Sequence, residues 1–516
     1  MCSGKVLAQA ELTHGVPRRR TDTMRPSTFI LSVAALVGSA CCASCAGSSD
    51  STASATAPNG TGTQTTTGTT PPAGPVTLAT HNPSQAATVG APFSYDATRG
   101  NTTFKDAAGK GLTYTVTLVP AANGLVAAAG KLSGTPATTG LVSVTITATD
   151  GAGATATDAF DVIAFAAGLA TPTLDPSLKY SDADGTVPAH FRAAGGPPGG
   201  GGGGGFGGAN AFDNTPASNP VTNAGAALGR VLFYDKRLSA NDAQACASCH
   251  VQSRGFADTA RLSGGFKGGF TGRHSMSLAN ARYYARGRFF WDERAVTLED
   301  QVLRPIQDTV EMGMTLDLLE KKLAVTTYYP ALFTAAFGTS TITRDRISLA
   351  LAQFVRSLVS GGAKFDQALT ATGGTATVFT AQEQQGFALF GPNCVRCHTT
   401  VALSADDIHN TGLDATITDV GAGGGRFKVP SLRNVAVRGR FMHDGRFTSL
   451  DQVVAFYDSG VQPNPALDPR LTGGRGGQPQ RLNLSAAERA ALVAFLGTLT
   501  DPTFLGDRRF GTPFSP

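Results

Sequence analysis

Two Cys-x-x-Cys-His motifs carry the clearest chemistry in this sequence. They consist of Cys246, Cys249 and His250, and of Cys394, Cys397 and His398. The spacing lets two thiols bond to the two vinyl groups of a haem while the adjacent imidazole binds the iron. A zinc site would bring four cysteines together, and a thioredoxin-like pair needs no adjoining histidine. The sequence therefore predicts two covalently bound c-type haems, with His250 and His398 as iron ligands.

Length, charge and cysteine usage limit what else the chain can be. Its 516 residues predict two or three domains. The net charge of +5 is spread without a dense basic block, so we expect no nucleic-acid partner. The other four cysteines all lie within residues 1–45, and none lies between Cys45 and Cys246. That distribution does not suit a disulfide framework.

Residues 1–45 have the pattern of an export signal, with Met24 as a candidate true start. The apolar run Phe29–Val37 is too short to span a bilayer as a permanent helix. We therefore expect a protein of the periplasm or cell envelope. Residues 38–41 also resemble a lipoprotein cleavage box, although Gly38 stands where a branched apolar residue is preferred. A lipid anchor stays open.

The segment after the leader changes from linker to β structure. Apolar residues alternate with polar ones over 142–148, which predicts a half-buried strand. Residues 155–163 predict a second strand that returns beside it. Residues 130–136 predict a turn-rich junction. The segment resembles the immunoglobulin-like (Ig-like; cadherin/dystroglycan-like) modules of secreted bacterial proteins. The run of glycines at 199–205 predicts a flexible joint, because no strand precedes it and no Lys-Ser/Thr follows.

Helical segments dominate the second half. Capping boxes at 380–383 and 485–488 predict one helix leading into the second haem motif and one closing helix after it. The predicted fold is multidomain, with a small all-β Ig-like sandwich followed by two mainly α-helical cytochrome c-type haem domains. The predicted regions are a leader (1–45), a disordered linker (46–75), an Ig-like domain (76–165), a Gly-rich linker (166–216), an N-terminal haem domain (217–375) and a C-terminal haem domain (376–510).

Several segments around the haem motifs resemble the bacterial di-haem cytochrome c peroxidase/MauG family, in the family's order. They are 228–235 (LGRVLFYD), 288–295 (RFFWDERA), Gln301, 305–307, 310–313, 428–434 (KVPSLRN) and 442–446 (MHDGR). The similarity spans about residues 219–505. It implies that peroxide binds at the haem of His250, while the haem of His398 stores and relays an electron.

The resemblance also assigns roles to three other residues. Trp291 is expected between the haems as an electron bridge, where the alternative is a buried core aromatic. Glu311 and Gln301 match the distal pair of the family. A carboxylate above the iron can move a proton between the two peroxide oxygens, and a glutamine can orient the peroxide by hydrogen bonds. Outside this context, Glu311 would be an ordinary surface charge.

The sequence departs from the family pattern at two places. Peroxidases of the family cap the resting first haem with a histidine from a Gly-His-Gly segment, whereas residues 264–268 here contain no histidine. We therefore expect a five-coordinate first haem that needs no prior reduction. His274 stands where the family has an asparagine that helps to hold calcium, and Arg438 and Arg440 stand at the carbonyl positions. Nearby positive charge disfavours a hard cation, so calcium is doubtful here.

The sixth ligand of the second haem has two candidates. Peroxidases of the family use a methionine there, and the MauG-type branch uses a tyrosine. Counting from the His443-Asp444-Gly445 segment favours Tyr457, and Met442 is the alternative thioether ligand. Each could instead pack in a core.

The predicted function is that of a periplasmic peroxidase that reduces hydrogen peroxide with electrons from a small c-type cytochrome or similar redox protein. One alternative is a MauG-like oxidase that removes electrons from a protein substrate. Another, from a different class, is a non-catalytic electron-transfer cytochrome joined to the β module. Family members are often dimers, so a homodimer is a further expectation.

Overall fold

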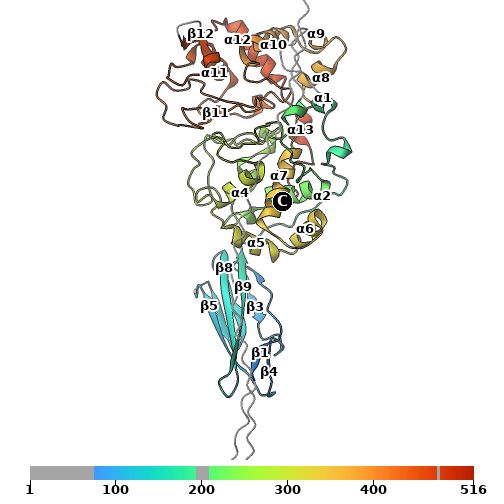
Figure 1. The fold of residues 1–516 in the computed structure, drawn as a ribbon, viewed down its shortest axis with the longest axis vertical. Helices are drawn as coiled ribbons and strands as arrows, with labels where there is room; N and C mark the ends of the chain where they lie inside the picture. The colour runs from blue at the N-terminus through green and yellow to red at the C-terminus, as the bar shows by residue number, and fades with distance from the viewer. Residues whose placement is uncertain (1–74, 122, 193–208, 474–476, 516) are drawn as a thin grey trace, which may run out of the picture. The chain divides into compact units, whose positions relative to one another are not determined.

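The structure is a computed structural model that describes residues 75–121, 123–192, 209–473 and 477–515 (Figure 1). All of these belong to one compact unit, Pro71–Pro516. The predicted leader, most of the first linker and the glycine run at 199–205 lie outside the described residues.

Residues 76–165 form the predicted β sandwich. Its strands are β1 (Val76–Leu78), β2 (Gln85–Thr88), β3 (Phe93–Asp96), β4 (Phe104–Asp106), β5 (Thr113–Val119), β6 (Leu125–Ala128), β7 (Lys131–Gly134), β8 (Gly140–Thr149) and β9 (Thr155–Phe165). The sheets run in the orders β2-β9-β8-β5, β3-β7-β6 and β1-β4. Strands β2 and β9 pair in parallel, whereas β8 pairs antiparallel with both β5 and β9.

Side-chain alternation places the core of this sandwich. Val142, Val144 and Ile146 of β8 are at most 1% exposed, while the polar residues between them face outward. The predicted strands at 142–148 and 155–163 are therefore confirmed. The segment 130–136 differs from the prediction, because 131–134 form strand β7 and only Gly130, with φ of 78°, makes the expected tight turn.

The first haem domain is helical. Its main helices are α2 (Asn223–Tyr234), α3 (Cys246–Cys249), α4 (Leu298–Gln307), α5 (Leu316–Ala324), α6 (Tyr329–Phe337) and α7 (Arg344–Ser357). Shorter turns of helix are η1 (Asp182–Asp184), α1 (Ala189–Arg192), η2 (Ala209–Phe212), η3 (Lys236–Leu238) and η4 (Gln252–Arg254).

The second haem domain repeats this plan with short strands added. Its helices are α8 (Lys364–Thr370), α9 (Thr375–Val378), α10 (Ala381–Cys394), η5 (Val435–Val437), α11 (Leu450–Ala455), η6 (Phe456–Gly460), η7 (Pro469–Leu471) and α12 (Ala486–Gly497), followed by α13 (Pro502–Gly506). Its strand pairs are β10 (Ile408–His409) with β11 (Phe427–Lys428), and β12 (Thr472–Gly473) with β13 (Gln478–Pro479). Both predicted capping boxes form, at Thr380 and Ser485.

The domain limits differ from the predicted ones because apolar side chains at the edges pack across them. Phe365 of α8 belongs to the core of the second domain. Phe504 and Phe510, placed in the second domain by sequence, pack in the core of the first, where Phe504 contacts Phe256 with ring centroids 5.6 Å apart. Tyr180 also packs in that first core, so residues 166–192 do not behave as the flexible linker that their position suggested.

The same helix crossing appears in both haem domains. In the first, a Cβ added at Gly229 of α2 would lie 2.0 Å from the carbonyl oxygen of Ala350 in α7. In the second, a Cβ at Gly386 of α10 would lie 1.9 Å from the carbonyl oxygen of Ala491 in α12. Each glycine thus lets two helix backbones touch, and that contact fixes the helix that leads to a haem motif.

This close approach predicts a position-specific loss of stability. Replacing Gly386 with valine should lower the free energy of unfolding by about 1–3 kcal/mol, because the added carbons must displace the backbone of Ala491. Gly391 in the same helix has open space at its Cβ, so Gly391→Ala should be neutral or stabilising by about 0.5–1 kcal/mol. Thermal unfolding of the haem-loaded protein measures both variants. Equal melting temperatures for Gly386→Val and wild type would contradict the prediction.

Candidate functional site

Each Cys-x-x-Cys-His motif folds into one tight turn that presents its histidine. The backbone N–H of His250 donates to the carbonyl of Cys246 at 3.0 Å, and that of His398 donates to the carbonyl of Cys394 at 3.0 Å. In the described part of the chain these cysteines are free thiols, available for thioether bonds to a haem. The sequence prediction of two equivalent attachment sites matches this geometry.

A second contact orients each imidazole. Nδ1 of His250 lies 2.9 Å from the carbonyl oxygen of Phe256, and Nδ1 of His398 lies 2.9 Å from that of Leu403. A carbonyl can only accept, so Nδ1 carries the proton and Nε2 keeps its lone pair for iron. Burial lowers the pKa of His398 to about 4, which holds that ring neutral.

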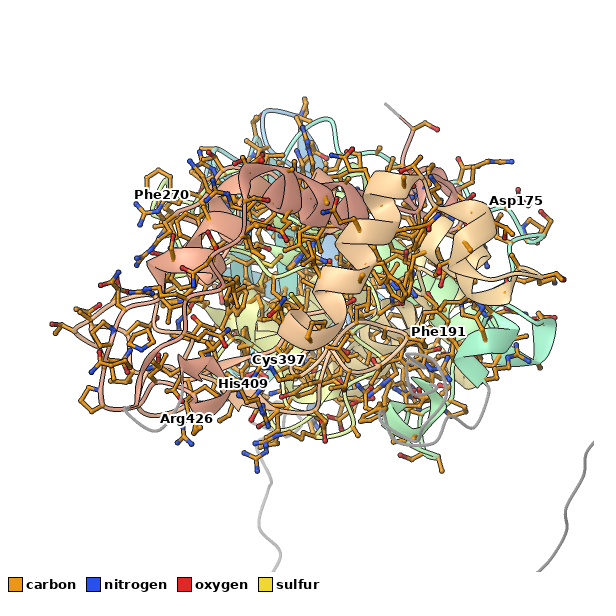
Figure 2. All side chains as sticks on the ribbon, turned by 90° about the horizontal axis from the view of Figure 1, so that it is seen from above. Asp175, Phe191, Phe270, Cys397, His409 and Arg426 are labelled. Atoms are coloured by element: carbon orange, nitrogen blue, oxygen red, sulfur yellow. The ribbon has the colours of Figure 1, made fainter. Side chains whose placement is uncertain are left out.

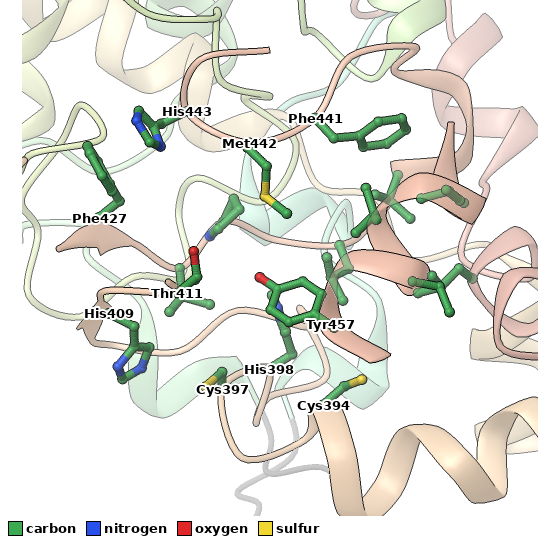
Figure 3. A pocket seen from close by; sticks show the side chains of 18 of the residues that line it. Cys394, Cys397, His398, His409, Thr411, Phe427, Phe441, Met442, His443 and Tyr457 are labelled. Carbon is green, nitrogen blue, oxygen red and sulfur yellow. The ribbon is translucent and has the colours of Figure 1, made fainter. Parts of the chain in front are cut away.

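The second motif opens into a mainly apolar cavity, called here the C-terminal cavity (Figure 3). Cys394, Cys397 and His398 line one side, and Tyr457 and Met442 also line it. The remaining lining includes Phe390, Leu432, Val454, Leu492 and Leu496. Such a wall suits the flat apolar face of a porphyrin, so the residues present fit a haem. Figure 3 shows the side chains of Tyr457 and Met442 pointing into this cavity, and the charges of Cys394 and Cys397 act on the Tyr457 phenol.

The first motif opens into another cavity, called here the N-terminal cavity. Cys249, His250, Gln301, Glu311 and Trp291 all line it. The sequence placed these residues around one haem from motifs scattered over 246–311, and the structure brings them together. Burial, helped by the negative charge of Asp308, raises the pKa of Glu311 to about 7.

A glycine-rich loop fixes Glu311 from outside the cavity. The backbone N–H of Phe266 donates to the carbonyl of Glu311 at 3.1 Å. A Cβ on Gly265 would lie 1.8 Å from the carbonyl oxygen of Val310. Residues 264–268, which contain no histidine, therefore pack directly against the backbone of Val310 and Glu311.

Trp291 lies where the two cavities meet. It lines both, and its indole N–H donates to the carbonyl of His274 at 2.8 Å. Its backbone carbonyl accepts from the backbone N–H of Lys428 at 2.8 Å, so Trp291 has hydrogen bonds to both haem domains. Arg273 strengthens this tie by pairing with Asp292 and Asp419 at 2.6 and 2.7 Å, and the pairing lowers the pKa of Asp419 to about 2.

The walls of the two cavities contain charged residues that the spacing of the sequence motifs did not single out. The Lys428 ammonium lies 3.5 Å from the ring centroid of Tyr284 and 4.4 Å from that of Phe289, and burial lowers its pKa to about 7. The buried Arg438 lines the C-terminal cavity. The family pattern singles out residues 428–434 and position 438 only by their place in the sequence. No local signal predicts that the side chains of Lys428 and Arg438 are buried in these cavities.

His409 is another residue whose place the sequence did not indicate. No motif in the sequence includes it, and it lines the C-terminal cavity close to Cys397 (Figures 2 and 3). Nδ1 of His409 lies 2.5 Å from a carboxylate oxygen of Asp468, and Arg470 contacts the ring from the other side at 2.6 Å. Motif spacing gives no signal for this position, because only the tertiary fold brings residues 409 and 470 to the haem motif.

The position proposed for calcium holds nitrogen groups. The His274 imidazole is 4% exposed, and its Nδ1 lies 3.1 Å from the carbonyl of Ala260. Arg438 brings a guanidinium to the same region; burial lowers the pKa of His274, and the positive charge of Arg438 adds to that effect. A hard cation takes oxygen ligands and is repelled by positive charge, so these residues do not fit calcium.

Known proteins are similar to this chain in sequence and in fold. A family model for di-haem cytochrome c peroxidase matches residues 223–373, and a model for an Ig domain matches residues 75–164. The chain is 34% identical over 298 residues to the methylamine utilization protein MauG of Methylophilus methylotrophus, covering 55% of this chain and 84% of that protein. It is 34% identical over 242 residues to cytochrome c551 peroxidase of Nitrosomonas europaea, covering 44% of this chain and 71% of that protein.

A solved structure agrees with these matches. The crystal structure of a MauG-like protein associated with microbial copper homeostasis superposes with a TM-score of 0.52 and 32% identity, covering 58% of this chain and 96% of that one. Fold and site thus define a di-haem c-type cytochrome with oxidoreductase activity. The chain belongs to the di-haem cytochrome c peroxidase/MauG family, and an Ig-like domain precedes its two haem domains.

Proposed function

We propose that this protein reduces hydrogen peroxide to water at the haem of His250, using electrons that a c-type cytochrome delivers through the haem of His398. The observation that carries the proposal is a carboxyl group, Glu311, in the same cavity as His250 with its pKa raised to about 7. An acid–base group works best when its pKa is close to the operating pH, because it can then both accept and donate a proton.

The residues of the N-terminal cavity divide the task. When bound, the haem supplies the position for peroxide and passes on the electrons that reduce it. The Glu311 carboxylate accepts a proton from one peroxide oxygen and returns it to the other, which leaves as water. Gln301, on the same cavity wall, orients the peroxide through its amide. Two electrons and two protons per peroxide complete the conversion to two water molecules.

Peroxide has direct access in the oxidised enzyme under this proposal. The loop that could bring a capping histidine contains none, and its backbone is held against Val310 and Glu311. A haem held by His250 would therefore keep an open position for peroxide and would need no prior reduction.

Electrons reach the first haem by way of Trp291. Its place on the wall of both cavities supports this role, because the ring offers an aromatic stepping point between two haems. Tyr457 is the proposed sixth ligand of the second haem, with Met442 as the alternative.

The second candidate function is a MauG-like oxidase that draws electrons from a protein substrate. The presence of Tyr457 in the C-terminal cavity, where the charges of both motif cysteines act on its phenol, favours it, since a phenolate stabilises oxidised iron more than a thioether does. Both candidates use the same peroxide chemistry and differ in the source of the electrons.

The proposed location is the periplasm or cell envelope. The family resemblance and the expected export signal support it, and a lipid anchor remains part of the proposal. Among the described residues, no helix is long and apolar enough to cross a membrane.

A spectroscopic experiment tests the proposal as a whole. The oxidised, haem-loaded protein should give EPR signals of one high-spin and one low-spin haem, and one equivalent of peroxide should change its absorption at once. Turnover with reduced c-type cytochrome should then consume peroxide and oxidise the cytochrome. Two low-spin haems that do not react with peroxide would contradict the proposal. Peroxide consumption without cytochrome oxidation would select the oxidase.

The role of Glu311 predicts a specific pH dependence. Only the ionised carboxylate can accept the peroxide proton, so kcat/KM for peroxide should rise with pH and level off above about 7. Glu311→Gln should lower kcat/KM by about 10²–10⁴-fold and abolish this inflection. Glu320→Gln, which neutralises a carboxylate paired with Arg344, serves as the matched control. An unchanged pH profile in Glu311→Gln would rule out the assignment.

Two variants distinguish the sixth ligands. Tyr457→Phe removes the phenol oxygen and should convert the low-spin EPR signal of the second haem to another spin state or ligand set. Met442→Leu keeps an apolar side chain of similar volume and should leave that signal unchanged. The reverse result would assign the ligand to Met442.

A further inference from the structure

A buried arginine at the edge of the C-terminal cavity lacks a full set of partners. Arg438 is 7% exposed, and its Nη2 donates to the carbonyls of Ser431 and Arg433 at 2.7 and 2.5 Å. Its Nε is buried and has no hydrogen-bond partner in the described chain. A buried donor without an acceptor is costly, so this nitrogen is expected to face a group that the protein alone does not supply.

The electrostatics of Arg438 specify the charge of that group. Burial alone lowers the pKa of Arg438 to about 10, and among the described residues no carboxylate forms a salt bridge with it. Its two partners are neutral carbonyls. A buried positive charge is stabilised mainly by an anion, and a guanidinium prefers the planar geometry of a carboxylate.

A second unpartnered atom marks the same region. Nε2 of His274 is buried without a partner, and His274 lines both cavities. Arg438, His274 and His398 all line the C-terminal cavity, and the positive charge of Arg438 acts on both imidazoles. Asp258 also acts on His274, but its carboxylate is occupied by Ser263 and the backbone of Ala260.

We propose that the Arg438 guanidinium binds a propionate of the C-terminal haem. A haem carries two carboxylates on one edge, and it is the anion that this cavity must accommodate once the haem of His398 is attached. Arg438 then supplies the positive charge beside the propionate. The nitrogen groups of Arg438 and His274 in this part of the C-terminal cavity do not suit a metal ion. The inference depends on the haem at His398 and does not depend on peroxide reduction.

The midpoint potential of the C-terminal haem measures this interaction. A cation beside the propionate disfavours the oxidised, more positive iron, so Arg438→Gln should lower the potential of that haem. Arg438→Lys keeps the charge and should retain most of the wild-type potential, although a lysine cannot form the paired guanidinium contact. Arg508→Gln removes the same charge from an exposed surface position and is the matched control.

Spectroelectrochemical titration of the haem-loaded variants gives the answer. A lower potential in Arg438→Gln, with Arg508→Gln unchanged, supports the proposal. Equal potentials in the two variants would overturn it. A wild-type potential that shifts when chloride and phosphate are removed from the buffer would place a free anion at Arg438 and would also overturn it.

A measurement on the wild-type protein covers the case in which Arg438→Gln loads no haem. If Arg438 provides the positive charge at this junction, EDTA and added calcium should both leave the potential of the C-terminal haem unchanged. A reversible shift on calcium removal would show that a metal ion occupies the position, and the proposal would fail.

Discussion

The hydrogen bond from Nδ1 of each haem-binding histidine to a backbone carbonyl is the contact on which the rest of the site depends. It fixes the tautomer of His250 and His398, and therefore leaves Nε2 as the atom that meets the iron. The carbonyls belong to Phe256 and Leu403, a few residues beyond each motif. Each cavity is thus arranged around an imidazole whose direction is set by its own loop.

The two haem-binding cavities share one wall. Trp291, Lys428 and His274 line both cavities, so a change of charge at one haem acts on groups that also face the other. Lys428 lies buried at this wall and Arg438 lies buried in the C-terminal cavity, and burial lowers the pKa of each.

The sequence predicted the parts of the fold that depend on local pattern. The haem motifs, the capping boxes at Thr380 and Ser485, and strands β8 and β9 all follow from residues close together in the chain. The family pattern placed Glu311, Gln301 and Trp291 in one cavity, and the structure places them there. The roles of these three residues stay predictions.

Other features could not be predicted because they depend on contacts between distant segments. The close helix crossings need Gly229 and Gly386, yet a lone glycine in a helix gives no signal of what it touches. Burial of Arg438 and Lys428 contradicts their usual surface preference, and only the tertiary fold reveals it.

The return of residues 502–514 to the first haem domain has a consequence for how the protein is made. Phe504 and Phe510 complete the core of that domain, and Arg230 of α2 donates to the carbonyl of Gly511 at 2.6 Å. The second haem domain is therefore an insertion within the first in terms of chain order. During synthesis the core of the first domain stays incomplete until the second domain has been made, so the first haem pocket cannot mature before the second domain is complete.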